Sequence, residues 1–266
     1  MDPTALTHAS VPPGPATRWA LFLDIDGTLL DIAPTPEEVV VPPGLGATLN
    51  RLFVTLGGAL AFVSGRTIES IDRLFSPLRL PAAGQHGAEI RVSDRECARL
   101  PLPSDTLADL RVQILAYAAS FPGVRVEDKG LGFAVHYRQA PAARARLENL
   151  LSQIVASHGR EVELLQGKSV LEIRSRNANK GRALEVLMKR PPFAGRVPVF
   201  IGDDRTDEDG FQAAERLRGR AVRVGAEHAS AGGFWLPETS AVRAWLQRLA
   251  EKKQFYEPAE GVRCKT

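Results

Sequence analysis

Two aspartates end a short apolar segment near the start of the chain. Residues 20–23 are continuously hydrophobic and lead into Asp24 and Asp26, with Gly27 and Thr28 directly after. A buried parallel strand has this composition, and its carboxyl end is the edge at which open α/β sheets bind ligands. Two close carboxylates repel each other unless a proton or a cation lies between them. The pattern predicts a ligand site with a divalent metal; an ordinary Asp-Gly turn is the alternative.

A second apolar segment ends in groups that can bind an anion. Residues 60–63 are hydrophobic and are followed by Ser64, Gly65 and Arg66. A hydroxyl at the end of a parallel strand, next to the exposed amides of a new helix, forms an anion site. Ser64 or Thr67 could instead cap that helix, which is the more common role of such residues. Beside the aspartate pair, anion binding is the better interpretation.

Lys180 opens a helix that we expect to run through Met188. A lysine in the first turn opposes the helix dipole, whose positive end already lies there. This position predicts that Lys180 faces an anion. A solvated lysine, at a cost of roughly a few tenths of a kcal/mol, is the alternative.

A further apolar strand, residues 197–201, leads into the acidic run that starts at Asp203 and Asp204. Thr206 as a helix cap, with acidic residues in the first turn, would explain the later part of this run. It does not explain the aspartates at the strand end. Mg²⁺ prefers oxygen ligands and usually takes one or two carboxylates with waters and substrate phosphate. The predicted magnesium ligands are Asp24, the carbonyl of Asp26, and Asp203.

The apolar strands alternate with helices, which predicts an α/β fold with an open, mostly parallel, Rossmann-like core sheet. Residues 221–224 are expected to be its final strand. From about residue 100 to residue 175 the pattern changes to two helices and two β-hairpins, which would break the alternation. We therefore predict an inserted mixed α/β cap domain over residues 100–175. The core would comprise residues 19–99 and 176–251, with a flexible arm at 1–18 and a flexible tail at 252–266.

Several polar residues of the insertion fall at turns and strand ends: Glu127, Lys129, His136, Arg138, Lys168 and Glu172. Each alone is typical of a solvated surface. Together they offer carboxylate acceptors and lysine donors, which suit the hydroxyl groups of a sugar. In the core, His86 lies in a glycine-flanked turn between two expected strands, where the backbone can approach a substrate closely; a structural histidine is the alternative.

Four segments resemble the motifs of the haloacid dehalogenase superfamily of phosphotransferases. They are Asp-x-Asp-Gly-Thr-Leu from Asp24, Ser-Gly-Arg from Ser64, Lys180, and Gly-Asp-Asp-x-Thr-Asp-Glu from Gly202. The resemblance implies that Asp24 is the nucleophile and Asp26 the general acid and base. Ser64 and Lys180 would hold the transferring phosphoryl group, and Asp207 would support the metal site.

The Gly-x-His-Gly sequence around His86 is similar to a signature of trehalose-6-phosphate phosphatases within that superfamily. The cap sequences Glu-x-Lys, His-Tyr-Arg and Gly-Lys-x-x-x-Glu-x-Arg also resemble those proteins. The likeness implies a disaccharide phosphate bound between core and cap. The implied substrate-binding residues are Gly27, Thr28, Gly65, Arg66, His86, Glu127, Lys129, Lys168 and Glu172.

The resemblance implies a Mg²⁺-dependent phosphatase that hydrolyses trehalose 6-phosphate through an aspartyl-phosphate. Trehalose-6-phosphate synthase would act in the same pathway. A phosphatase or mutase for another sugar phosphate, such as sucrose 6-phosphate, would keep the core motifs and differ in the cap. A non-catalytic sugar-phosphate sensor is a further alternative, which the intact Asp24 and Asp26 pair disfavours.

The composition agrees with a soluble globular protein. The chain has 266 residues, 44% hydrophobic and 24% charged, with a net charge of +3. This charge is too small to indicate a nucleic-acid partner. The first residues lack the basic and apolar regions of a secretory signal, and no apolar run is long enough to cross a membrane. The two cysteines match no disulfide or metal spacing, so we expect a cytoplasmic protein.

Overall fold

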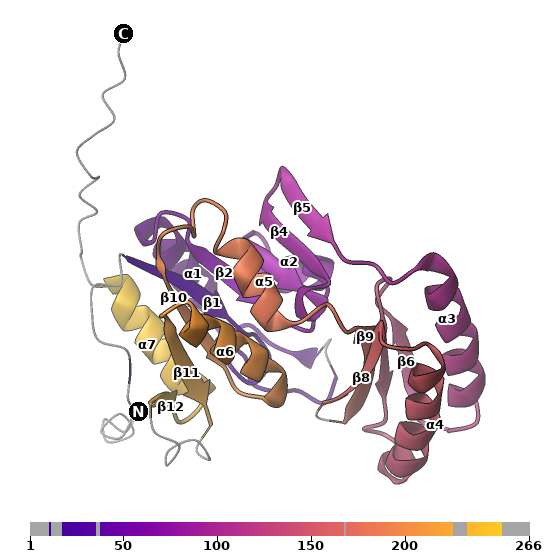
Figure 1. Cartoon of the computed structure of the whole chain (residues 1–266). Coiled ribbons are helices and arrows are strands. Elements are labelled where there is room, and N and C mark those ends of the chain that lie inside the picture. Colours follow the sequence, from indigo (N-terminus) through magenta and orange to yellow (C-terminus); the bar gives the residue numbers. More distant parts are fainter. Residues whose placement is uncertain (1–10, 12–17, 36–37, 168, 226–232, 252–266) are drawn as a thin grey trace.

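The computed structural model describes residue 11 and residues 18–35, 38–167, 169–225 and 233–251. The predicted arm, apart from Val11 and Arg18, and the predicted tail therefore lie outside the described residues, as does Lys168. The described chain forms two β-sheets that lie side by side, each with its own helices (Figure 1).

The larger sheet of the described chain has eight strands in the order β12-β11-β10-β1-β2-β3-β4-β5. Its strands are β1 (Trp19–Leu23), β2 (Leu60–Val63), β3 (Ala82–Gly84), β4 (Glu89–Ser93), β5 (Glu96–Arg99), β10 (Val197–Gly202), β11 (Arg220–Val224) and β12 (Phe234–Leu236). Neighbours from β12 to β3 run parallel, and β4 and β5 are added antiparallel. Every residue of β1 and β2 is buried, because both faces of the sheet are covered by helices. The predicted mostly parallel core is confirmed.

The helices of the core lie on the two faces of this sheet (Figure 1). They are α1 (Leu45–Thr55), α2 (Ile68–Phe75), α5 (Lys180–Leu187), α6 (Glu208–Arg216) and α7 (Thr239–Glu251). The chain moves outward in one direction from β1 to β3 and in the other from β10 to β12. Right-handed crossovers then put α1 and α6 on opposite faces; α7 packs with α1, and α5 packs with α6. Neighbouring strands β1 and β10 mark the reversal, which is where such sheets bind ligands.

Two strands of the large sheet were not predicted. Strand β12 follows residues 221–224, which were expected to be the last strand, and pairs parallel with β11. It has three residues, too few for a hydrophobic period to be recognised. Strand β5 is exposed along its whole length, and it forms because a hairpin pairs it with β4 rather than because it buries apolar side chains.

The smaller sheet has the order β6-β7-β9-β8 and is antiparallel throughout. Its elements are α3 (Ser104–Ala118), β6 (Arg125–Asp128), β7 (Phe133–His136), α4 (Arg144–Ser157), β8 (Val162–Gly167) and β9 (Val170–Ser175). A separate hydrophobic cluster, which includes Leu110, Phe133, Leu147 and Ile173, joins the helices to the sheet. We refer to this unit as the cap; its boundaries at residues 100 and 175 stay a prediction.

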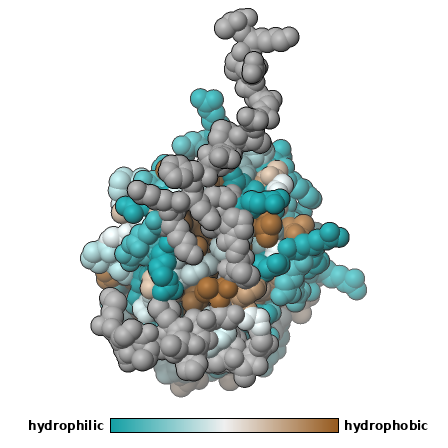
Figure 2. All heavy atoms as spheres, turned by 90° about the vertical axis from the view of Figure 1, so that its left-hand side faces the viewer, coloured by the Kyte–Doolittle hydropathy of each residue, from teal (hydrophilic) through white to brown (hydrophobic). Residues whose placement is uncertain are grey.

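The outer surface of the core is mixed. On the side turned away from the cap, hydrophilic residues predominate among the described atoms, with small hydrophobic patches between them (Figure 2). In the described part of the chain, no helix is both long enough and apolar enough to cross a membrane.

Candidate active site

The turn after β1 brings Asp24 close to two aspartates that follow β10, Asp203 and Asp207. The backbone amide of Asp24 donates to the carbonyl of Ile201 at 3.0 Å, which aligns the ends of β1 and β10. Gly27 has a φ of +89°, and a Cβ on it would lie 2.2 Å from Oδ2 of Asp203. Glycine is therefore required for the turn and for the close approach of the Asp203 carboxylate. The hydroxyl of Thr28, which is fully buried, donates to Asp203 Oδ1 at 3.1 Å.

Lys180 is buried against two of these carboxylates. Its Nζ donates to Asp24 Oδ1 and to Asp207 Oδ1, both at 2.7 Å, and the residue is 2% exposed. Asn179 caps α5 by accepting from the amide of Arg182, which fixes the first turn of the helix. The carboxylates raise the pKa of Lys180 although its burial alone would lower it. The lysine is therefore a fixed positive charge at the carboxyl edge of the sheet.

Both carboxylate oxygens of Asp207 accept hydrogen bonds from the protein. Besides Lys180, its carboxylate accepts from the amides of Asp203 at 3.0 Å and Asp204 at 3.1 Å. A Cβ on Gly202 would lie 2.3 Å from Asp207 Cγ, so this position needs glycine as well. The N-capping residue of the following turn, Arg205–Asp207, differs from the prediction. Asp204, not Thr206, is the capping residue, and it accepts from both the amide and the hydroxyl of Thr206.

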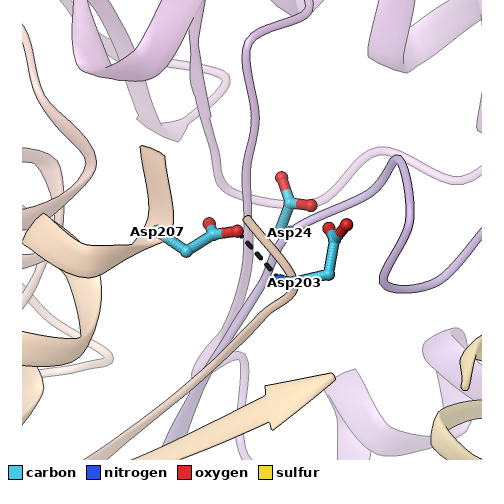
Figure 3. Close-up of side chains that lie close together, drawn as sticks. All are labelled: Asp24, Asp203 and Asp207. Atoms are coloured by element: carbon cyan, nitrogen blue, oxygen red, sulfur yellow. Dashed lines mark hydrogen bonds between the residues drawn. The ribbon is translucent and has the colours of Figure 1, made fainter. Parts of the chain in front are cut away.

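The aspartates form a candidate metal site (Figure 3). One carboxylate oxygen each from Asp24, Asp203 and Asp207 lies within 4.8 Å of the others. Burial raises the pKa of Asp24 well above its ordinary value, and the neighbouring carboxylates raise it further. A divalent cation would relieve both effects. Because Asp207 is engaged by Lys180 and two amides, Asp24 and Asp203 are the better direct ligands.

Asp26 and the Ser64 turn meet at the same edge. The guanidinium of Arg66 binds Asp26 in a bidentate ion pair, with both N to O distances at 2.7 Å. Arg66, predicted to bind substrate, thus holds Asp26 in this structure. Ser64 is 1% exposed and accepts from the amide of Arg66. Thr67 is the N-cap of α2.

A second charged group joins core and cap. Lys129 donates to the Gly65 carbonyl and to Glu172 Oε1, each at 3.0 Å. The other oxygen of Glu172 lies 2.7 Å from Nε2 of His86. Burial alone would raise the pKa of Glu172, but Lys129 and His86 outweigh it and hold this pKa well below its usual range. Burial lowers the pKa of His86 to about 4, so the imidazole is neutral at pH 7.

Core and cap enclose a cavity of about 290 Å³, a size that admits a small molecule. Eleven of the predicted site residues line it: Asp24, Asp26, Ser64, Gly65, Arg66, His86, Glu127, Lys129, Glu172, Lys180 and Asp203. Glu127 contacts His136 at 3.0 Å, and this hydrogen bond lowers the pKa of Glu127. Arg138 reaches from the cap to the Ala33 carbonyl of the core. Thr28 and Asp207 do not line the cavity; they contact residues that do, Asp203 and Lys180 respectively.

Some residues of the site were not predicted. Arg125 and Gln139 of the cap line the cavity. Arg174, which is buried, forms an ion pair with Glu163 at 2.9 Å. It is the last residue of the motif Gly-Lys-x-x-x-Glu-x-Arg, but the sequence analysis gave it no role; its position two residues after Glu172 was a further signal, since alternate residues of a strand share a face.

The fold and the site together define a haloacid dehalogenase-like α/β protein with a capped, acidic active site. Comparison with solved structures agrees. The C-terminal domain of a trehalose-6-phosphate phosphatase from C. albicans superimposes with a TM-score of 0.76 at 22% identity, covering 88% of this chain and 92% of that one. A trehalose-6-phosphate phosphatase related protein gives a TM-score of 0.65 at 25% identity, over 86% and 96% of the two chains.

Sequence comparison then gives the family. A family model described as Trehalose-phosphatase matches residues 22–234. A probable trehalose-phosphate phosphatase from Sinorhizobium fredii is 45% identical over 234 residues, 88% of each chain. A trehalose-6-phosphate phosphatase from Escherichia coli is 40% identical over 239 residues, 90% of this chain and 89% of that one. The chain belongs to the trehalose-phosphatase family.

Proposed function

We propose that the protein is a Mg²⁺-dependent enzyme that hydrolyses trehalose 6-phosphate to trehalose and phosphate. The observation that carries this proposal is that two sets of charged residues, one from the core and one from the cap, line the same cavity. Asp24, Asp203 and Lys180 lie on the core side, and Glu172 and Lys129 lie on the cap side. The core side suits a phosphate with a metal, and the cap side suits sugar hydroxyls. The names of the relatives identify the sugar.

The donor set fits Mg²⁺. Asp24 and Asp203 supply hard carboxylate oxygens at one point, and the backbone carbonyl of Asp26 follows in the same turn. When bound, the ion would neutralise charge on the phosphoryl oxygens. The raised pKa of Asp24 supports this assignment, because the carboxylate becomes a usable nucleophile only if positive charge keeps it ionised.

The residues then have complementary roles in two displacements. Asp24 attacks phosphorus, the bond to the sugar oxygen breaks, and an aspartyl-phosphate forms. Asp26 donates a proton to the leaving sugar oxygen. In the second step Asp26 takes a proton from the water that attacks phosphorus, and Asp24 is released as a carboxylate. Arg66 orients Asp26 through both carboxylate oxygens.

The remaining core groups stabilise the charge that develops on phosphorus. Lys180, which donates to Asp24, and Ser64, which lines the same cavity, would hold the phosphoryl oxygens, and the backbone amides near Gly27 would donate to them. On the cap, Glu127, Lys129 and Glu172 bind the sugar, and the closed cap excludes water. Lys168, which lies outside the described residues, completes this set by resemblance.

The setting of the reaction follows from the substrate. A sugar phosphate synthase, trehalose-6-phosphate synthase by the likeness, would supply it. We place the reaction in the cytoplasm, where the free, exposed thiol of Cys97 stays reduced.

Phosphate release from a panel of sugar phosphates tests the proposal. The panel contains trehalose 6-phosphate, sucrose 6-phosphate, glucose 6-phosphate and mannose 6-phosphate, each with Mg²⁺ and with EDTA. We expect Mg²⁺-dependent release that strongly favours trehalose 6-phosphate. Preference for another sugar would overturn the assignment of the cap, and release in EDTA would overturn the metal. Binding without any release would establish a sensor instead.

A further inference from the structure

We propose that His86 is a positioning residue that aligns the cap with the phosphate site by holding Glu172. This inference rests on the proposed function, because it concerns how the sugar-binding carboxylate is placed relative to Asp24. The family resemblance implies that His86 binds substrate, and it assigns His86 no role in holding the cap. The structure places it between the two halves of the active site.

The core holds His86 rigidly. The residue occupies the short 3-10 turn Gln85–Gly87 between β3 and β4, with a φ of 56°, and is 7% exposed. Its amide donates to the Ser64 carbonyl at 2.9 Å. A Cβ on Gly65 would lie 2.6 Å from His86 Nε2, so the imidazole packs directly on the backbone of the phosphate-binding turn. The position of the imidazole ring is therefore set by the position of that turn.

The hydrogen bond to the cap fixes the tautomer of His86. The Glu172 carboxylate can only accept, so Nε2 of His86 carries the proton across the 2.7 Å contact. Lys129 donates to the other oxygen. An ionised carboxylate has about four acceptor positions, so about two remain for sugar hydroxyls. Glu172 is thus oriented from the core and the cap at once and keeps capacity for a ligand.

The second nitrogen of His86 has no hydrogen-bond partner among the described residues, and neither has one atom of Arg174, a second cap residue. In the described chain two buried side-chain atoms have no hydrogen-bond partner, and they are His86 Nδ1 and Arg174 Nη1. In the neutral Nε2–H tautomer Nδ1 is an acceptor, and Nη1 is a donor. Leu171 and Ile173 face the cap interior, so Glu172 and Arg174 share the opposite face of β9. The charge of Arg174 is near enough to lower the pKa of His86.

These observations give each nitrogen of His86 a partner, at alternate positions of β9. Nε2–H donates to Glu172, and Nδ1 can accept from Arg174 through one bridging water. A shift of the cap along β9 would break both contacts. Because a misplacement of about 1 Å at a reacting centre can cost roughly 10²-fold in rate, holding this register affects catalysis without His86 touching phosphorus.

A pair of variants separates positioning from simple packing. Gln can present an N–H donor and an adjacent oxygen acceptor, whereas Ala presents neither. For the sugar phosphate that the wild type hydrolyses fastest, His86→Ala should lower kcat/KM by roughly 10- to 100-fold. His86→Gln should recover most of this loss. His158→Ala, which breaks another His to Asp contact within the cap, is the matched control and should change kcat/KM less than about threefold.

A double-mutant cycle identifies the route of the effect. If His86 acts through Glu172, the His86→Ala change should cost less than about threefold in a Glu172→Ala background. Losses that simply multiply, or equal losses in the Ala and Gln variants, would overturn the proposal. The choice of substrate does not matter to this cycle, so it stands apart from the test of sugar specificity.

A spectroscopic measurement needs no activity at all. In ¹⁵N NMR spectra at pH 7, His86 should be neutral with its proton on Nε2. Arg174→Met should shift the Nδ1 resonance, because it removes the N–H donors and the positive charge of the guanidinium. A proton on Nδ1, or an Nδ1 resonance that is insensitive to Arg174, would contradict the inference.

Discussion

The site contains two buried ionic groups that differ in their charge balance. In the Lys180 cluster (Lys180, Asp24, Asp203 and Asp207), one cation faces three carboxylates from the edge of one sheet. In the Glu172 cluster (Glu172, Lys129 and His86), one carboxylate is matched by one ammonium and one neutral imidazole, and the contacts cross between two sheets. The first cluster has an excess of negative charge and attracts a further cation. The second is balanced and suits neutral hydroxyl groups.

The largest expected effect comes from replacing Asp24, the proposed nucleophile, in the Lys180 cluster. Asp24→Asn should lower kcat by at least about 10³-fold, because no other carboxylate is placed to form the covalent intermediate. The fold should survive, since asparagine has the shape of aspartate and Asp207 still pairs with Lys180. Phosphate release and thermal unfolding measure the two effects. Asp31→Asn, in the exposed part of the same loop, is the control; turnover by Asp24→Asn near the wild-type rate would refute the mechanism.

Removing the cation should cost stability as well as activity. Lys180→Met leaves carboxylates buried without their partner, so the free energy of unfolding should fall by about 3 kcal/mol or more at pH 7. Urea unfolding measures this change. Lys189→Met, an exposed lysine just after the same helix, should change stability by less than about 0.5 kcal/mol. Equal stabilities of the two variants would mean that the cluster is not a coupled unit.

The Glu172 cluster should respond to acid through His86. The unfolded histidine titrates near 6.5 and the folded one near 4. Between these values the unfolded chain binds a proton that the folded chain does not, so stability is fully present above about pH 6.5 and falls as the pH drops. From pH 7 to pH 5 the wild type should lose about 2 kcal/mol more than His86→Gln. Urea unfolding at both values tests this; parallel losses would show that His86 is not held neutral.

The smallest effect is expected from the lysine of the cap. Lys129→Met removes the donor to Glu172 and to Gly65, and the KM for the sugar phosphate should rise about tenfold with kcat within about threefold. Steady-state kinetics measures both constants. Arg111→Met, which breaks a partly exposed ion pair between α3 and Asp128 at the end of β6, should leave both within about twofold. A change in kcat alone would assign Lys129 to the chemical step.

The two clusters also differ in how far sequence could predict them. The Lys180 cluster consists of groups at strand ends and helix starts, so local composition and topology bring Asp24, Asp203 and Lys180 to one edge. The Glu172 cluster depends on which face of β9 is turned to the core, and that orientation is decided by packing between the two sheets. Arg174 ends the motif Gly-Lys-x-x-x-Glu-x-Arg, but its place near His86 depends on that packing, so the sequence assigned it no role.

Smaller errors have local physical causes. Thr206 was expected to cap the helix after β10, but Asp204 takes this place because its carboxylate reaches both the amide and the hydroxyl of Thr206. Arg66 was assigned to substrate, and its two-point contact with Asp26 depends on a residue 40 positions away. Short strands such as β12 carry no periodic signal. The family resemblance corrects none of these, because they are matters of geometry.

The path of the chain through β9 has a consequence for engineering. Glu172 lies in β9, and Asn179 and Lys180 begin α5 shortly after it, so one continuous segment carries both the carboxylate proposed to bind the sugar and the lysine proposed to bind the phosphate. A chimera that exchanges caps at the predicted boundary would join a foreign β9 to the native α5. Its specificity would change cleanly only if the graft preserved the length of residues 173–179, because that spacer sets where the imported carboxylate stands above the native catalytic aspartate.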